Sequence, residues 1–184
     1  MNLQELRTDC AIKQKKGLHF ILASIIIWLA ITIVYSTGLP ILTKNLYAFC
    51  CTAPLMPIAF FISKIIKVDF QNKKNPLTNL GILFSVNQIV YLLIAMWIFT
   101  AVPDKMLMVF TMIFGAHLMP YSWLYSSKSY MILSVIIPIA ALFVGLNFAP
   151  AVLGMMMIGV EFAFSMCLIL ENKKRLITNN EFAG

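Results

Sequence analysis

The chain has 184 residues, of which 61% are hydrophobic and 11% are charged. Soluble domains carry about 25% charged residues, so this composition excludes a soluble globular protein and predicts one whose solvent is lipid. The net charge of +7 does not indicate nucleic-acid binding, because the basic residues lie in clusters between apolar runs and not along one face. We expect a single integral membrane domain over residues 1–184.

Residues 1–16 are expected to lie in the cytoplasm, with Leu3, Leu6 and Cys10 on one side of a helix that suits the membrane surface. The basic residues here resemble the leader of a signal peptide. The apolar run that follows is too long for one, however, and no cleavage site precedes Pro40, so we expect a retained anchor.

Long apolar segments make up most of the remaining chain. A helix needs about 20 apolar residues to cross a bilayer, and helices satisfy their own backbone groups without water. The alternating pattern that a lipid-exposed barrel requires is absent. The sequence therefore predicts an all-α bundle of six transmembrane helices, followed by a cytoplasmic tail over residues 171–184. The predicted spans are residues 17–37, 44–66, 77–101, 105–125, 129–148 and 150–170.

The spans form three helical hairpins, because each outward-going span ends at a proline: Pro40 in "TGLP", Pro103 in "TAVP" and Pro150 in "NFAP". Proline stops one helix and is tolerated in the first turn of the next. Pro40 and Pro57 are 17 residues apart, as are Pro103 and Pro120, and "TAPLMP" aligns with "GAHLMP" in this register. We interpret the first two hairpins as an internal duplication.

Prolines inside the spans are expected to bend the helices and to free a backbone carbonyl four residues earlier. Pro54 and Pro57 predict a strong break in the second span. Pro120 and Pro138 predict bends in the fourth and fifth spans. Bent helices can leave a cavity, although better packing is the commoner outcome.

The basic residues predict the orientation. With six spans, both termini lie on one side, and 12 of the 14 lysines and arginines fall on that side, leaving Lys44 and Lys105 on the other. The positive-inside rule then places both termini in the cytoplasm, where the lysines meet anionic headgroups.

Glu161 is the only acidic residue well inside a span. A charged carboxylate at the centre of a lone helix costs about 2.5–3.5 kcal/mol on insertion scales, so Glu161 must keep its proton or find a partner. Helical rise places it near the depth of His117 and Gln88. We predict a polar site near the middle of the membrane, with Glu161 and His117 as a proton-exchanging pair. Its residues are Glu161, His117, Asn87, Gln88, Tyr91 and Tyr121. The alternative is that these residues only hold the helices together.

Other features favour structural roles. His19, at the start of the first span, is expected to be solvated, and the aromatic belt at the inner interface accounts for Tyr121, Trp123, Tyr125 and Tyr130. The four cysteines show no pairing motif and are expected to fill helix interfaces. No catalytic motif is present, and no cofactor or metal is predicted.

The segments "KQKKGLHFILASIIIWL" and "FGAHLMPYSWLYSSKSYM" resemble an uncharacterised family of small multi-pass bacterial membrane proteins, a domain of unknown function. The resemblance implies a bacterial inner-membrane protein and carries over no functional residue. A small transporter or a proton-linked handler of a solute or lipid is the leading hypothesis, and a homodimer would suit it. The alternative is a non-catalytic membrane interaction, immunity or accessory protein. An intramembrane enzyme has the least support.

Overall fold

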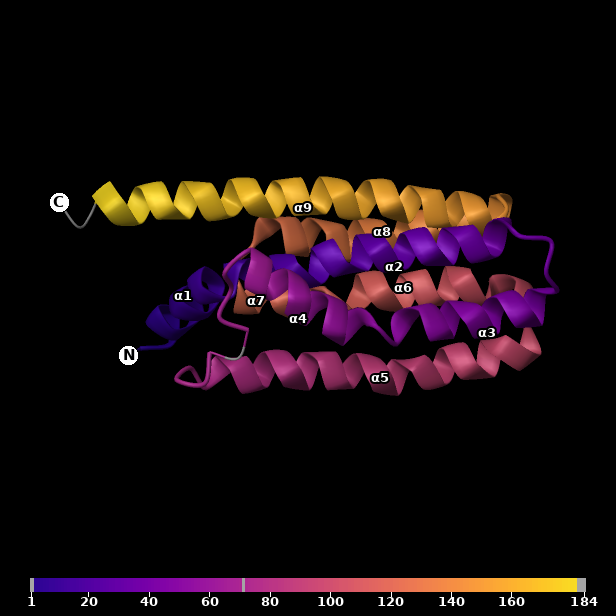
Figure 1. Cartoon of the computed structure of the whole chain (residues 1–184), viewed down its shortest axis with the longest axis horizontal. Helices are drawn as coiled ribbons and strands as arrows, with labels where there is room; N and C mark the ends of the chain where they lie inside the picture. Colours follow the sequence, from indigo (N-terminus) through magenta and orange to yellow (C-terminus); the bar gives the residue numbers. More distant parts are fainter. Residues whose placement is uncertain (1, 71, 182–184) are drawn as a thin grey trace.

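The computed structural model describes residues 2–70 and 72–181, with side chains described as far as Lys174. The chain is helical over these residues and forms no strand within them. Six helical segments of this part are long and apolar enough to cross a membrane. The prediction of an all-α, six-helix bundle is therefore confirmed, and both termini lie at the same end of it (Figure 1).

The helices begin and end close to the predicted spans, except that the last one continues beyond residue 170. The 3₁₀ turns are η1 (Lys15–Gly17) and η2 (Pro103–Lys105). The α-helices are α1 (Leu3–Lys13), α2 (Leu18–Ser36), α3 (Ile41–Thr52), α4 (Leu55–Ile65), α5 (Leu77–Ala101), α6 (Met106–His117), α7 (Met119–Leu124), α8 (Lys128–Asn147) and α9 (Pro150–Glu181).

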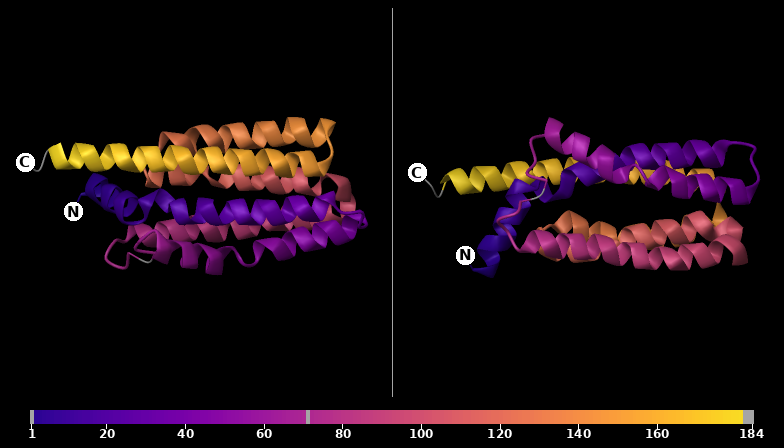
Figure 2. Two further views of the ribbon diagram at one scale, coloured as in Figure 1. Left: turned by 45° about the horizontal axis from the view of Figure 1, so that its top comes forward. Right: turned by 60° about the horizontal axis from the view of Figure 1, so that its bottom comes forward.

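The long helices form two groups. In the first group, α2 packs against α9, α3 and α4, so the first and last spans of the chain are neighbours. In the second group, α6 packs against α5, α7 and α8. Figure 2 (right) shows the two groups as separate layers, and contacts of α9 with α8 and α6 join them.

Two spans are broken at corresponding places of the predicted repeat. The second span divides into α3 and α4 at Ala53 and Pro54, and the fourth divides into α6 and α7 at Leu118. Leu118 aligns with Leu55, the first residue of α4. Such a shared break is what an internal duplication predicts. The duplication itself stays an interpretation.

The fifth span behaves differently, because α8 continues as one helix through Pro138. Gly115 of α6 lies directly against this part of α8. A Cβ atom on Gly115 would lie 2.6 Å from Cδ of Pro138 and 2.7 Å from Cγ2 of Ile137. The absence of a side chain at Gly115 therefore lets α6 and α8 approach closely.

The first helix is held against the bundle. Asp9 accepts hydrogen bonds from the side-chain amides of Asn75 (2.8 Å) and Asn72 (3.1 Å), and its carboxylate lies 2.6 Å from Nζ of Lys13. Burial raises the pKa of Asp9, but the hydrogen bonds from Lys13, Asn75 and Asn72 outweigh it and hold the pKa below its ordinary value. Arg7 also bonds to the carbonyl oxygen of Trp123. The segment is thus a helix, as expected, and it packs on the chain.

A second polar cluster joins η1, α8 and α9 at the end that holds the termini; we call it the Glu171 cluster. Nζ of Lys16 lies 2.5 Å from Oε2 of Glu171. The same carboxylate accepts hydrogen bonds from the hydroxyls of Ser127 (2.7 Å) and Ser129 (2.6 Å). The hydroxyl of Tyr130 donates to the carbonyl of Lys16 at 2.9 Å. These bonds fix the first turn of α2 to α8 and α9.

Candidate functional site

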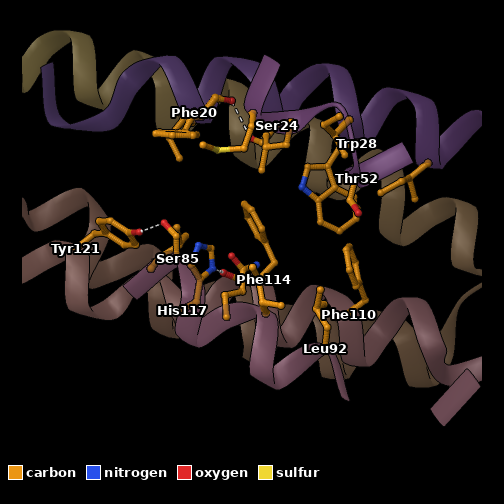
Figure 3. Close-up of a pocket in the computed structure, with 18 of the residues that line it drawn as sticks. Phe20, Ser24, Trp28, Thr52, Ser85, Leu92, Phe110, Phe114, His117 and Tyr121 are labelled. Carbon is orange, nitrogen blue, oxygen red and sulfur yellow. Dashed lines mark hydrogen bonds between the residues drawn. The ribbon is translucent and has the colours of Figure 1, made fainter. Parts of the chain in front are cut away.

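A cavity of about 320 Å³ lies between the two groups of helices. Its walls come from α2, the α3–α4 break, α5, α6, α7 and the start of α8. Figure 3 shows residues of α2 facing residues of α5, α6 and α7 across it. Most of the lining is apolar, and it includes Trp28, Ile31, Leu92, Phe110 and Phe114. The two-group architecture therefore creates a hollow where a single close-packed bundle would have a core.

Few polar side chains line this cavity, and several are on the second group. Oη of Tyr121 lies 2.7 Å from Oγ of Ser85 and donates to the carbonyl of Gly81 at 2.9 Å. Nδ1 of His117 lies 2.5 Å from the carbonyl oxygen of Phe114, so Nδ1–H donates this bond. A neutral imidazole that donates through Nδ1 keeps Nε2 as an acceptor.

The opposite wall carries Ser24 of α2, which connects the cavity to Glu161. Oγ of Ser24 lies 2.5 Å from Oε2 of Glu161 and 2.7 Å from the carbonyl oxygen of Ile21. Glu161 is fully buried, and its Oε1 has no hydrogen-bond partner in the described part of the chain. The carboxyl group therefore lies one hydrogen bond behind the cavity wall.

The predicted site residues fall into three sets. His117, Gln88 and Tyr121 line the cavity. Glu161 reaches it only through Ser24. The third set, Asn87 and Tyr91, is exposed on α5 and is not part of the lining. One step along a helix turns a side chain by about 100°, so Asn87 cannot share the face of Gln88.

Glu161 and His117, which the sequence predicts to exchange a proton, have different hydrogen-bond partners in the structure. Ser24 takes the place of the histidine at the carboxylate, and His117 bonds to the backbone of its own helix. The physical reason is the pairing of helices, because Glu161 lies where α9 packs on α2. Gly154, Glu161 and Ser165 lie on this face of α9 and are all buried.

Ser24, Thr52 and Ser85 also line the cavity, and the predicted site contains none of them. Ser85 lies three residues before Gln88, and side chains at this spacing share a helix face. The prediction of Gln88 could therefore have been extended to Ser85. Ser24 lies in the run "LASIII" and carries no such signal. Only the packing of α2 against α9 brings its hydroxyl to Glu161.

The assignment of the tyrosines to an aromatic belt is wrong for Tyr125 and Tyr130. Both are buried and line the cavity. Their hydroxyls donate to Oε1 of Gln14 and to the carbonyl of Lys16, each at 2.9 Å. These bonds hold the rings inward, whereas Trp123 is exposed. The tyrosines therefore form the part of the cavity wall nearest η1.

His19 is also buried, contrary to the expectation that it is solvated. Its ring lies 4.4 Å from that of Phe20 and 5.2 Å from that of Phe70, measured between centroids. It does not line the cavity. Among the residues that the structure describes, no group of three histidine, cysteine or acidic side chains could hold a metal ion.

Six apolar helices of membrane-spanning length, arranged as two groups around a largely apolar cavity, define a helical membrane protein. The chain belongs to a family of unknown function, DUF7010, whose model matches residues 3–171. This membership confirms the resemblance to an uncharacterised domain. No curated protein and no solved structure matches the chain.

Proposed function

We propose that the protein is a small transporter, or a proton-linked handler of a solute or lipid, that binds a small and mostly apolar molecule in the cavity. The observation that carries the proposal is the cavity itself. Ligand pockets commonly have volumes of about 300–1,000 Å³, apolar walls and a few convergent polar groups. The cavity has such a volume, and the side chains of Ser85, Gln88, His117 and Tyr121 supply the polar groups.

We also propose that the protein lies in the inner membrane of a bacterial cell with both termini in the cytoplasm. The support is the distribution of basic residues along the bundle. The start of α3 and the turn between α5 and α6, which contain Lys44 and Lys105, lie at the end opposite the termini. The segment before α2 and the α4–α5 connection, which contain other lysines, lie at the end that holds the termini (Figure 1). An excess of lysine and arginine marks the cytoplasmic side of a membrane protein.

The cavity is tested by filling it. Leu92 lines the cavity, whereas its neighbour Leu93 is 64% exposed on the outer face of α5. Leu92→Trp should lower saturable binding of the neutral probe N-phenyl-1-naphthylamine at least about tenfold, because the indole takes up the space of the ligand. Leu93→Trp should bind as the unmodified protein does. Binding to protein in lipid nanodiscs, less that to empty nanodiscs, gives the comparison. Equal binding by the two variants contradicts the proposal.

The alternative, a membrane interaction protein, is supported by the outer face of α5. This span is the least buried of the six, and it exposes Asn87 and Tyr91. An amide without a partner is costly in hydrocarbon, so a helix from another chain, including a second copy, would stabilise it. An interaction role predicts that Asn87→Leu abolishes complex formation in the membrane while Leu92→Trp has no effect. If the protein instead binds a ligand in the cavity, Leu92→Trp should lower ligand binding and Asn87→Leu should leave it unchanged.

A further inference from the structure

Glu161 has no cationic partner among the described residues. The helices and the turn packed against α9 carry several titratable or basic groups, but none of them forms a hydrogen bond or ion pair with Glu161. They are His19 and Tyr35 on α2, His117 on α6, Lys128 and Tyr130 on α8, and Lys15 and Lys16 in η1. Lys16 is already paired with Glu171. An ionised carboxylate buried without a partner is very costly.

The contacts of Ser24 show how this cost is avoided. Its Oγ lies within hydrogen-bond distance of two oxygens, the carbonyl of Ile21 and Oε2 of Glu161. A hydroxyl carries only one hydrogen, and a carbonyl oxygen can only accept. If the hydroxyl donates to Ile21, the contact with Glu161 is a hydrogen bond only when the carboxyl group donates to Oγ. A protonated Glu161 satisfies both contacts at once.

Two buried polar atoms at or near the carboxyl group nevertheless form no hydrogen bond with the described residues. Oε1 of Glu161 and Oγ of Ser165, one turn further along α9, are both buried without a hydrogen-bond partner in the described residues. Most buried polar atoms in proteins have a partner. The interface of α2 and α9 therefore holds an acidic group that a ligand near Ser24 could engage.

The lining of the cavity indicates the charge of that ligand. Among the side chains that the structure describes, no lysine, arginine, aspartate or glutamate lines it, so an anion would find no opposite charge there. Seven lining residues are aromatic, and the ring of Trp28 lies 5.7 Å from that of Phe114 and 6.1 Å from that of Phe110. Aromatic faces attract cations, most strongly where water is excluded. An acid, Glu161, contacts the lining residue Ser24.

We propose that the cavity takes a hydrophobic monovalent cation, and that its binding ionises Glu161 and releases one proton. The inference rests on the proposed function of the cavity. In the empty protein Glu161 is a neutral acid that donates to Ser24. When the cation enters, the carboxyl O–H bond breaks, the electron pair stays on the carboxylate, and the proton passes to water. The net charge of the site is the same before and after the exchange.

The experiment compares two probes of the same shape. Benzyltrimethylammonium carries a positive charge, and neopentylbenzene has carbon in place of the nitrogen. Protein in nanodiscs is titrated with each probe in weakly buffered solution containing a pH indicator. The cation should release about one proton per site, and its affinity should rise about tenfold per pH unit while Glu161 is protonated in the empty site. Neopentylbenzene should release none and show no pH dependence.

Glu161→Gln should abolish the proton release and the pH dependence and still bind neopentylbenzene. Asp104→Asn, which neutralises an exposed acid at an outer turn, should behave like the unmodified protein. If Glu161→Gln does not fold, the proton release and pH dependence measured with both probes on the unmodified protein still test the inference. Binding of neopentylbenzene with no preference for the cation and no proton release overturns this inference alone. Absence of binding by both probes, with equal behaviour of the Leu92 and Leu93 variants, overturns the proposed function as well.

Discussion

Gly115 of α6 lies directly against Pro138 and Ile137 of α8, and it is two residues from His117 in the cavity wall. The contact atoms on α8 belong to a proline ring and a β-branched side chain. Neither can rotate far to make room. The position of the His117 imidazole at the cavity thus depends on the presence of glycine at position 115, about half a helical turn away.

Gly115→Ala should therefore destabilise the protein, by about 1–3 kcal/mol, because the new methyl group overpacks the contact between α6 and α8. Gly159→Ala is the matched control, since a Cβ there would meet nothing within 4 Å. Thermal unfolding in detergent, followed by circular dichroism, compares the two. A Gly115→Ala variant as stable as Gly159→Ala would contradict the close approach of these helices.

Residue patterns identified part of the candidate site. The lone acidic residue deep in a span predicted that Glu161 faces the interior, and its complete burial agrees. The sequence pattern could not identify the residue that contacts Glu161, because the polar face of one helix does not indicate which other helix packs against it. Similar depth in the membrane made His117 the predicted partner of Glu161. In the structure α2 packs against α9, so Ser24 is the partner instead.

Among the helices, proline positions predicted more of the structure than any other feature. The turns at Pro40, Pro103 and Pro150 and the breaks in the second and fourth spans follow from the loss of a backbone donor. Pro138 shows the limit of this reasoning, because α8 continues through it. Whether a proline bends or divides a helix depends on the packing around it, which local sequence does not specify.

In the Glu171 cluster, one carboxylate contacts both Lys16 of η1 and the serines at the start of α8. Glu171→Ala removes the partner of Lys16 and of two serine hydroxyls. We expect faster amide hydrogen exchange in the first turn of α2 and at the start of α8, because a lost buried pair leaves its partners unsatisfied.

Lys173→Ala, an exposed change two residues further along α9, is the control for that experiment. Exchange measured by mass spectrometry on the protein in nanodiscs should be unchanged in this variant. Equal protection in both variants would show that Glu171 does not hold the three elements together.

For the molecule as a whole, the fold class followed from composition and span length, but the division into two groups did not. It depends on contacts between spans far apart in the chain, such as α2 with α9. The placement of basic residues at the end with the termini leads to a direct test of orientation.

In a cysteine-free background, Gly38→Cys should react with a membrane-impermeant maleimide on intact cells, because the proposed topology places the turn between α2 and α3 outside the cell. Lys73→Cys, in the connection between α4 and α5, should react only after the cells are permeabilised. Labelling in the opposite order would invert the proposed topology.

The pairing of α2 with α9 also bears on biosynthesis. Helix α2 acquires its main neighbour only after α9, the last of the six described spans, has been made. Until then, the hydroxyls of Ser24 and Thr32 on the nascent first span are without the α9 surface that buries them in the finished protein. The inserted chain therefore lacks this helix interface until α9 has joined the bundle, and a stop codon before Pro150 would remove the interface altogether.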